Sequence, residues 1–347
     1  MDLRSGPLAG NTEKYASFQE TREMLPKVSF LVPLYNEADT VLRMLQSVLG
    51  QNYPTGSLEI VIALAPSSDK TEQIVRDFMD QHPEIVMVLI DNPGGNTSTG
   101  RNLCLEKATG DYVLNFSGHA IADTSLVRVL VDKIDFLPPD VAGIGCGIQT
   151  ADSGTWIGRS IASLTNSPLG GGGAVDSNYN ADCDGPARSV AFTLYRTSIL
   201  RQLGGFDPAF WCGQDAELNL RLAANDYRLW FTPDTRVQHI KRKRTEDFIQ
   251  QMYRYGIARA RLTWKHPHSF RMTFLLPSIF LLTIVLLAVG SWLTPIQWIT
   301  LAGLFAGLSF LSAMVARSTL AAIAISPFFY FTMYVSYGFG FLRGWLP

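Results

Sequence analysis

The chain contains 347 residues, of which 47% are hydrophobic, and it carries a formal net charge of −1 at pH 7. This length accommodates one large domain and an additional segment. The near-zero charge argues against a nucleic-acid-binding protein, because neutralising phosphates requires a clear basic excess. The cysteines show neither metal-type pairs nor a compact disulfide framework, so we interpret them as reduced cytoplasmic thiols in the core. They are Cys104, Cys146, Cys183 and Cys212.

The first 26 residues are expected to form a flexible N-terminal arm. They are polar up to Met24 and contain no apolar run, so we expect neither a signal peptide nor a membrane anchor there. From Lys27 onward, apolar runs alternate with amphipathic helical patterns. Strands are predicted at residues 28–33, 58–64, 85–90 and 112–116, with helices through 42–49 and 69–79 and from about 98. This alternation predicts an α/β fold with a parallel sheet covered by helices on both faces.

Ligands of such sheets bind beyond the carboxyl ends of the strands. The segments that follow the predicted strands should therefore surround one crevice. These segments are residues 33–37, 65–69, 91–101 and 117–123. The stretch from Asn92 to Arg101 is rich in Gly and Thr, and it offers backbone N–H groups and one guanidinium to a diphosphate. A flexible solvated loop would have a similar composition.

Farther along the chain, a helix through Val127 and Leu130 and a strand at 141–148 precede a run of four glycines. Consecutive glycines fix no backbone conformation, so residues 166–173 are predicted to form a mobile loop, either a lid on the acceptor side or a plain linker. The next strand is predicted at 187–196, and it leads into a glycine turn at residues 204–207.

The helix that follows this turn carries Asp215 and Glu217 in its first turn. Carboxylates at this position are favoured by the helix dipole and stay ionised, as a general base acting on a hydroxyl group must. The alternative is an ordinary N-terminal charge preference with a surface ion pair between Glu217 and Arg221.

The last third of the chain changes in composition. Residues 241–272 interleave Lys and Arg with aromatic residues, which is typical of a helix lying on an anionic cytoplasmic leaflet. The apolar runs Phe274–Leu293 and Trp298–Ala316 are long enough to cross a bilayer. A third run, Leu320–Leu342, contains Pro327, and either it spans or it lies partly in the interface. The flanking cations put the preceding domain in the cytoplasm. A buried helical hairpin in a soluble domain is the alternative.

Four motifs in this order resemble the family-2 glycosyltransferases of GT-A fold, in particular the membrane-anchored exopolysaccharide enzymes of the succinoglycan type. The motifs are Val32-Pro33-Leu34-Tyr35-Asn36-Glu37, Pro66-Ser67-Ser68-Asp69-Lys70-Thr71, Gly100-Arg101-Asn102 and the Gln214-Asp215 helix. The resemblance extends from Lys27 to the C-terminus. It implies a GT-A domain at 27–240, a basic interfacial helical segment at 241–272 and a transmembrane region of two to three helices at 273–347. It also favours the lid at 166–173.

By this resemblance, Asp215 is the catalytic base. The nucleotide sugar is bound by Pro33, Tyr35, Asn36, Glu37, Asp69, Arg101, Ser117, Gly118, Gln214 and Arg254, and Gln251 and Glu217 contact the acceptor or the diphosphate. Some of these residues have structural alternatives: Asn36 in a helix-capping turn, Ser68 or Asp69 as an N-cap, and Arg254 as one cation of an interfacial helix. Two positions depart from the family pattern. Ala65 replaces a second Asp, which alters base recognition, and Gln214 replaces a Glu.

The metal motif departs furthest. Relatives carry Asp-x-Asp or Asp-x-His for Mg²⁺ or Mn²⁺ on the diphosphate, whereas this chain has Ser117-Gly118-His119. A serine hydroxyl is a poor substitute for a carboxylate on a hard cation, and His119 favours Mn²⁺ over Mg²⁺. Three alternatives follow: a weakened site of His119 and diphosphate oxygens, a metal-free site in which basic groups neutralise the diphosphate, or an inactive protein.

The resemblance implies an inverting glycosyltransferase of the hexosyltransferase type. It would take a sugar from a nucleotide sugar and transfer it to a membrane-associated, polyprenyl-diphosphate-linked saccharide in cell-surface polysaccharide synthesis. We expect a multi-pass protein of the cell membrane with its catalytic domain on the cytoplasmic side and no nucleic-acid partner. The alternative class is a catalytically degenerate nucleotide-binding or scaffold subunit of a polysaccharide assembly complex, which the departures at Ala65 and Ser117 motivate.

Overall fold

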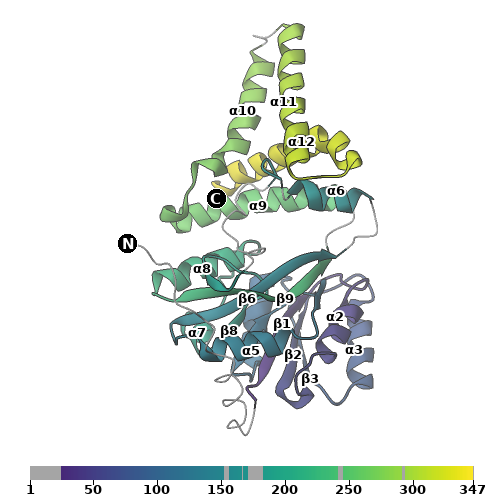
Figure 1. The fold of residues 1–347 in the computed structure, drawn as a ribbon, viewed down its shortest axis with the longest axis vertical. Helices are drawn as coiled ribbons and strands as arrows, with labels where there is room; N and C mark the ends of the chain where they lie inside the picture. The colour runs from purple at the N-terminus through teal and green to yellow at the C-terminus, as the bar shows by residue number, and fades with distance from the viewer. Residues whose placement is uncertain are drawn as a thin grey trace.

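The computed structural model describes residues 25–151, 156–165, 167–170, 183–240, 245–290 and 294–346. Within them, an α/β sheet domain lies beneath a group of long helices (Figure 1). Almost all of the predicted N-terminal arm lies outside the described residues. So do the basic run at 241–244 and, in the predicted lid, residue 166 and residues 171–173.

The centre of the sheet is the predicted parallel part. β1 (Val28–Leu34) pairs in parallel with β2 (Leu58–Leu64) and β4 (Tyr112–Asn115), and β2 pairs with β3 (Val86–Asp91). The strand register alternates side chains between two faces, so Phe30 and Val32 of β1 lie in one core while Leu31 lies in the other. Both faces are buried, which explains why these strands read as continuous apolar runs.

Beyond β4 the sheet is mixed, where the sequence predicts a mostly parallel one. The strands are β8 (Leu194–Arg196), β6 (Val141–Ala151), β9 (Arg228–Ile240), β5 (Ala120–Ala122) and β7 (Gly185–Ala187). The order is β3-β2-β1-β4-β8-β6-β9-β5, and β7 pairs with β9. β8 runs antiparallel to β4 and β6, and β5 and β7 run antiparallel to β9, while β6 and β9 are parallel. These three antiparallel strands have three residues each, too few to show a sequence period.

Helices cover both faces as predicted. One core contains side chains of α2 (Val41–Leu49), α3 (Thr71–Gln81) and α5 (Leu126–Phe136). The opposite core contains side chains of α4 (Thr97–Lys107), α7 (Thr197–Gln202) and α8 (Gln214–Ala224). The helix with Asp215 therefore packs on the same face as the helix with Arg101.

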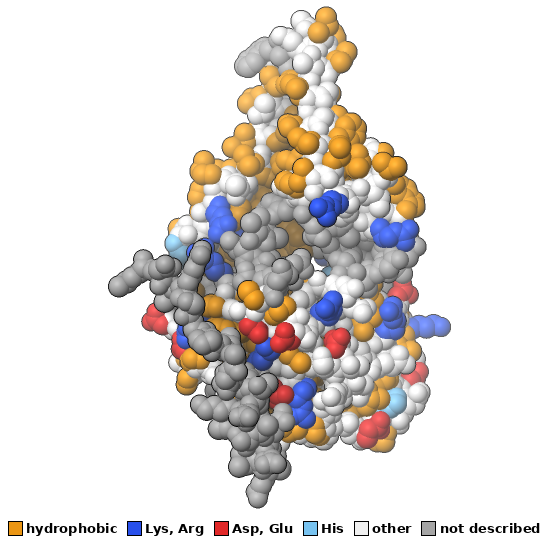
Figure 2. All heavy atoms as spheres, in the orientation of Figure 1, with side chains coloured by type: hydrophobic (Ala, Val, Ile, Leu, Met, Phe, Trp, Pro, Cys, Tyr) orange, Lys and Arg blue, Asp and Glu red, His pale blue; other side chains and the backbone are white. Residues whose placement is uncertain are grey.

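The upper group contains α6 (Trp156–Thr165), α9 (Thr245–Lys265), α10 (Leu276–Val289), α11 (Pro295–Val315) and α12 (Leu320–Gly344). Short 3₁₀ turns at Thr55–Ser57, Pro267–Ser269 and Met272–Leu275 complete the described helices. By length and composition, three segments could cross a membrane: Met272–Val289, Pro295–Val315 and Leu320–Gly344. In Figure 2, hydrophobic side chains cover the visible face of the protrusion formed by α10 and α11.

α12 is set apart from the other two apolar helices by its position. In Figure 1, α10 and α11 rise as a hairpin, whereas α12 lies along α9 at the base of that hairpin. The two helices meet backbone to backbone through glycine. A Cβ atom on Gly256 of α9 would lie 2.2 Å from the Tyr337 carbonyl oxygen, and one on Gly340 of α12 would lie 2.0 Å from the Tyr253 carbonyl oxygen. Small residues that allow such approach fix α12 on α9.

Candidate active site

The turn after β1 is bound to the turn after β2. The Asn36 side-chain oxygen accepts a hydrogen bond from the Ser68 backbone N–H at 2.8 Å, and the Asn36 backbone N–H donates to Ser67 Oγ at 3.1 Å. Asn36 has a φ of 53°, a left-handed conformation that Asn tolerates better than most residues. Two of the predicted crevice segments are therefore side by side.

Asp69 joins the same two turns through its carboxylate. One oxygen accepts from the Ala38 backbone N–H at 2.9 Å, and the other accepts from the Thr71 N–H at 3.0 Å and the Thr71 hydroxyl at 2.5 Å. Burial would raise the pKa of Asp69, but the hydrogen bonds from Thr71 and Ala38 outweigh it and lower that pKa. Lys70, and neither Ser68 nor Asp69, is the N-cap of α3, so the Asp69 carboxylate joins the two turns without capping the helix. Tyr35 in the turn after β1 differs from Asp69 in its exposure. It is 60% exposed, so a ligand can reach it, and Pro33 is half-buried.

A second group of predicted residues meets at the end of β4. The His119 Nδ1 atom lies 2.7 Å from Glu37 Oε1, and the other oxygen of Glu37 accepts from the Thr40 hydroxyl. The ring of His239 on β9 packs edge-on against His119, with centroids 4.8 Å apart. A Cβ atom on Gly118 would lie 2.5 Å from Leu34 Cδ2, so glycine allows this close packing.

Within the described parts of the chain, no group of three or more His, Cys, Asp or Glu side chains could hold a metal ion. Among the described residues, the buried Ser117 hydroxyl has no hydrogen-bond partner, and it supplies only a weak ligand. The Glu37 carboxylate and the His119 imidazole are ligand types that Mn²⁺ accepts. The pair fits a divalent ion provided that diphosphate oxygens complete the coordination.

The structure also brings together Arg101 of α4 and Asp215 of α8, which are 114 residues apart in the sequence. Gly100 permits α4 to pack closely on β1 and β2, since a Cβ atom there would lie 3.2 Å from that of Pro33. The next residue, Arg101, is buried, with its guanidinium 5.1 Å from the centroid of the Phe206 ring. Its Nη1 donates to Asp215 Oδ1 at 3.1 Å.

Asp215 lies in the first turn of α8, as predicted, and its side chain is 39% exposed. A further donor contacts the same oxygen: Asn115 Nδ2 of β4 lies 2.8 Å from Asp215 Oδ1. Among the described residues, the other oxygen, Oδ2, accepts no hydrogen bond. Asp215 is therefore held through one oxygen and presents the other. Asn115 is absent from our predicted site, although it is the one amide in the apolar run Tyr112–Phe116.

Glu217 lies in a different environment from Asp215. Its side chain is fully buried, and its carboxylate bonds to Arg221 at 2.9 Å, to Lys265 at 2.6 Å and to His266 at 3.3 Å. The predicted pair with Arg221 is present, but it is buried instead of exposed. Burial would raise the pKa of Glu217, yet the hydrogen bonds from Arg221 and Lys265 lower it. Glu217 thus joins α8 to the end of α9, and it is not exposed to an acceptor.

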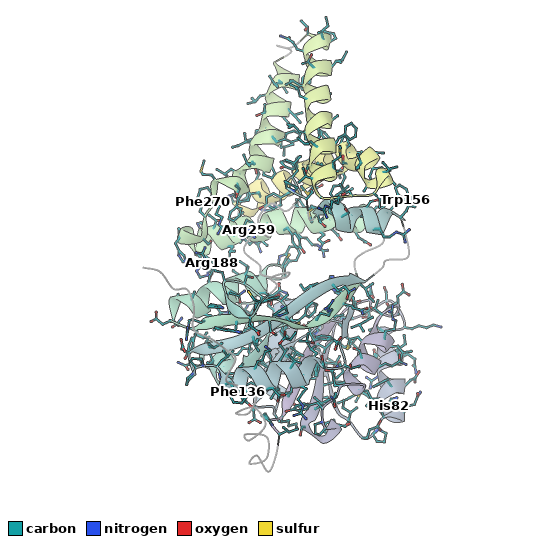
Figure 3. All side chains as sticks on the ribbon, in the orientation of Figure 1. His82, Phe136, Trp156, Arg188, Arg259 and Phe270 are labelled. Atoms are coloured by element: carbon teal, nitrogen blue, oxygen red, sulfur yellow. The ribbon has the colours of Figure 1, made fainter. Side chains whose placement is uncertain are left out.

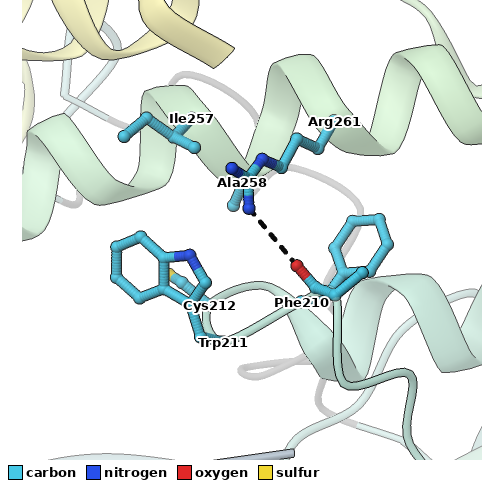
Figure 4. A pocket seen from close by; sticks show the side chains of 7 residues that line it. Phe210, Trp211, Cys212, Ile257, Ala258 and Arg261 are labelled. Carbon is cyan, nitrogen blue, oxygen red and sulfur yellow. Dashed lines mark hydrogen bonds between the residues drawn. The ribbon is translucent and has the colours of Figure 1, made fainter. Parts of the chain in front are cut away.

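α9 covers the loop that leads into α8. Figure 4 shows Trp211 and Cys212 beneath Ile257, Ala258 and Arg261 of α9. The guanidinium of Arg254 lies 5.3 Å from the centroid of the Trp211 ring. Trp211 precedes Asp215 by four residues in the sequence. Gln214 is the half-buried first residue of α8.

Gln251, one turn before Tyr255 on α9, points to a neighbour on the same helix. Its side-chain amide donates to the Tyr255 hydroxyl at 2.8 Å, at an exposed position. We call the loop that leads into α8, which contains Trp211 and Cys212, the active-site loop. Arg254 lies near this loop through its contact with Trp211, whereas no contact of Gln251 with it is observed among the described residues.

The described part of the predicted lid is attached to the apolar helices. The Ser167 hydroxyl lies 2.5 Å from that of Tyr330 on α12, and the Leu169 N–H donates to Ser312 Oγ on α11 at 3.1 Å. In addition, Ser163 of α6 bonds to Ser318 at 2.6 Å. Residues 167–170 thus pack on α11 and α12.

Two family models match the chain. The model described as glycosyl transferase family 2 matches residues 29–204, and the model described as glycosyl transferase family group 2 matches residues 121–339. Together they cover the sheet domain and most of the apolar helices.

Two curated relatives are each matched over about three quarters of this chain. The dolichyl N-acetyl-α-D-glucosaminyl phosphate 3-β-D-2,3-diacetamido-2,3-dideoxy-β-D-glucuronosyltransferase of Methanococcus voltae is 25% identical over 73% of this chain and 81% of its own length. The succinoglycan biosynthesis protein ExoA of Rhizobium meliloti is 27% identical over 77% of this chain and 78% of its own.

A solved structure with a similar fold is the mannosyltransferase PcManGT of Pyrobaculum calidifontis in complex with GDP-Man and Mn²⁺. It has a TM-score of 0.56 and 18% identity, over 96% of this chain and 93% of that chain. The predicted GT-A fold is confirmed by this likeness, which at such low identity concerns the fold alone.

Proposed function

Because the chain belongs to glycosyl transferase family 2, we propose that it transfers a sugar from a nucleotide-sugar donor, with inversion, to a membrane-associated saccharide in cell-surface polysaccharide synthesis. The observation that carries this proposal is Asp215. Its carboxylate is fixed at Oδ1, and no described residue donates to Oδ2; it stands at the start of a helix that packs between the sheet and α9. A fixed carboxylate with one free oxygen is suited to accept a proton from a hydroxyl group.

The proposed step is a single displacement. Asp215 Oδ2 accepts the proton of an acceptor hydroxyl while the hydroxyl oxygen forms a bond to the anomeric carbon of the donor. The bond between that carbon and the diphosphate oxygen breaks, and its electron pair leaves with the nucleoside diphosphate. Attack from the side opposite the leaving group inverts the anomeric configuration. Tyr35 and Asn36 would contact the nucleotide at the carboxyl ends of β1 and β2.

The leaving diphosphate requires positive charge. We propose that His119 and Glu37, together with diphosphate oxygens, would hold Mn²⁺ or Mg²⁺ there, and that such an ion would supply positive charge to the leaving group. Arg101 already donates to Asp215, so in the metal-free alternative the neutralising role moves chiefly to Arg254.

Membrane attachment is supported by the layer around α9. In Figure 3, Trp156, Arg259 and Phe270 lie at one level, between the sheet domain and the α10–α11 hairpin. Trp156 is 53% exposed, and Trp264 of α9 is also exposed. Aromatic and basic side chains at one level are typical of a membrane interface. We therefore propose that α10 and α11 cross the membrane and that α9, α6 and α12 lie at its cytoplasmic surface.

This arrangement can be tested by thiol labelling of sealed vesicles. Native Cys183 of the sheet domain is exposed, and a Leu346→Cys variant adds a thiol just after α12. Two spans put both thiols on the same side, so a membrane-impermeant reagent should label both or neither. Labelling of only one of the two would mean that α12 also crosses the membrane.

The acceptor is proposed to be a saccharide linked to a polyprenyl diphosphate, because the active-site loop lies under a helix of the interfacial layer. Purified protein in lipid bilayers would be given a panel of labelled UDP- and GDP-sugars, with lipid extract as the source of acceptor. The expected result is nucleotide release, with label in a lipid-extractable product of inverted anomeric configuration. Label only in water-soluble products would contradict the acceptor class. Nucleotide binding without any turnover would favour the scaffold alternative.

A further inference from the structure

We infer that Asn115 is a positioning residue for the catalytic base: with Arg101, it holds one oxygen of Asp215 and directs the other at the acceptor hydroxyl. The inference rests on the proposed function of Asp215 as the base.

The two donors approach one atom from two elements of the domain. Asn115 Nδ2 at the end of β4 lies 2.8 Å from Asp215 Oδ1, and Arg101 Nη1 of α4 lies 3.1 Å from the same oxygen. A carboxylate that needed only charge neutralisation would be satisfied by a bidentate arginine, with one bond to each oxygen. Here both bonds converge on Oδ1. The geometry therefore determines which of the two carboxylate oxygens is bound, in addition to placing a positive charge beside the carboxylate.

Both donors are held rigidly. The Asn115 backbone lies in β4, paired with Leu31 of β1 on one side, and its N–H donates to the Thr193 carbonyl on the other at 3.0 Å. The Asn115 side chain is almost fully buried. The Arg101 side chain is 8% exposed and lies against the Phe206 ring. A carboxylate bound by two immobile donors has little freedom to rotate, which is the condition for efficient proton transfer.

An amide suits this position better than a charged group. Asp215 is ionised before the reaction and neutral after it accepts the proton on Oδ2. Oδ1 remains a hydrogen-bond acceptor in both states, so the bonds from Asn115 and Arg101 persist through the transfer. A carboxylate at position 115 would instead place a second negative charge against the base.

Among the residues that the structure describes, two buried polar atoms of this arrangement are unsatisfied, and the same holds for Oδ1 of buried Asn219, which does not contact the base. Asn115 Oδ1 and Arg101 Nε have no hydrogen-bond partner within the described structure. Buried unsatisfied groups are uncommon in folded proteins and concentrate where another requirement determines the side-chain orientation. For Asn115 that requirement is to direct its amide N–H₂ at Asp215.

The test compares Asn115→Ala and Asn115→Asp with Asn219→Ala in the full-length protein in lipid bilayers. Asn115→Ala removes the donor without adding a charge, whereas Asn115→Asp keeps the shape of the side chain, removes the donor and adds a negative charge beside the base. Asn219 is a matched control, since it is also a buried Asn, on the same helix as Asp215, and it donates to Ser189 Oγ at 3.1 Å without contacting the base. We expect kcat to fall about 10²-fold in both Asn115 variants. The donor KM, nucleotide affinity and melting temperature should stay close to those of Asn219→Ala.

Unchanged kcat in both Asn115 variants would overturn the inference, provided that Asp215→Asn is inactive. A loss of kcat that comes with weakened nucleotide binding and a lower melting temperature than Asn219→Ala would also overturn it, because the role would then be structural. If Asn115→Ala does not fold, Asn115→Leu, which is close to Asn in size and removes the donor without adding a charge, replaces it. Failure of the proposed function is distinguishable, since Asp215→Asn would then retain turnover.

Discussion

The first turn of α8 carries two carboxylates, Asp215 and Glu217, which lie in different regions of the molecule and have different surroundings. Toward the sheet, Asp215 is 39% exposed and bound through one oxygen by Asn115 and Arg101. Toward α9, Glu217 is fully buried and is bound through both oxygens by Arg221, with Lys265 on one of them. The helix dipole favours both carboxylates equally. What separates a proposed base from a structural anion is therefore whether an oxygen is left free.

The largest expected effect is on the rate constant of Asp215→Asn. The amide cannot accept the proton, and general-base groups contribute about 10² to 10⁴-fold to a rate. We expect kcat to fall by about 10³-fold, with nucleotide-sugar affinity by calorimetry unchanged. Substantial residual turnover would transfer the base role to another group.

Glu217→Gln should instead affect stability. The substitution leaves Arg221 and Lys265 facing an uncharged group in a buried site, and breaking a buried ion pair costs about 3 to 5 kcal/mol of the free energy of unfolding. Chemical denaturation would measure this loss. Asp140→Asn is the matched control, because it breaks the exposed pair with Arg228, and its effect on the free energy of unfolding should be far smaller. Equal losses in the two variants would mean that burial adds nothing to the α8–α9 junction.

The same junction predicts how stability depends on pH. The pKa of Glu217 is lowered by hydrogen bonds from Arg221 and Lys265 that outweigh its burial, so its contribution is present above the ordinary glutamate value of 4.5 and is lost as pH falls through the lower folded value. Burial would lower the pKa of Lys265, but Asp207 and Glu217 raise it above 10.5, so its contribution is lost only as pH rises beyond that value. The stability difference between wild type and Glu217→Gln should shrink in acid, as the Glu217 carboxylate becomes protonated. A difference that grows in acid would contradict this assignment.

A smaller effect is expected on the donor side. His119→Ala should weaken stimulation by Mn²⁺ by about tenfold, because the ion would lose its one imidazole ligand. Mn²⁺ titrations of nucleotide release would measure the shift. His82→Ala is the control, since His82 also pairs with a glutamate, Glu84, but lies at the end of α3. Turnover that is insensitive to Mn²⁺ and to chelation in both variants would favour the metal-free alternative.

The sequence predicts those helices and strands whose apolar residues form a continuous run or recur at a regular spacing. The strands β1 to β4 and the helices α2 and α3 follow from apolar runs and amphipathic spacing. The antiparallel strands β5, β7 and β8 do not, because three residues carry no period. The position of α12 along α9 could not be predicted either, because its composition is that of a candidate span and its glycine contacts with α9 depend on the fold.

The position of a candidate site residue in the fold could be predicted where a motif exists, and its contacts with distant residues could not. Asp215 was expected at the start of a helix and lies there. Its contacts with Arg101 and Asn115 join positions at least 100 residues apart, so no local pattern encodes them. The ion pair between Glu217 and Arg221 could be predicted from their spacing of four residues. The burial of Glu217 could not, because it depends on α9, which contributes Lys265.

The most direct test is one measurement of kcat for Asp215→Asn and Glu217→Gln side by side, each corrected for the fraction of folded protein. We predict that Asp215→Asn is lower by at least about 10²-fold, because only this variant loses the group that accepts the proton. Equal values of kcat would contradict the assignment of Asp215 as the base and of Glu217 as a structural anion.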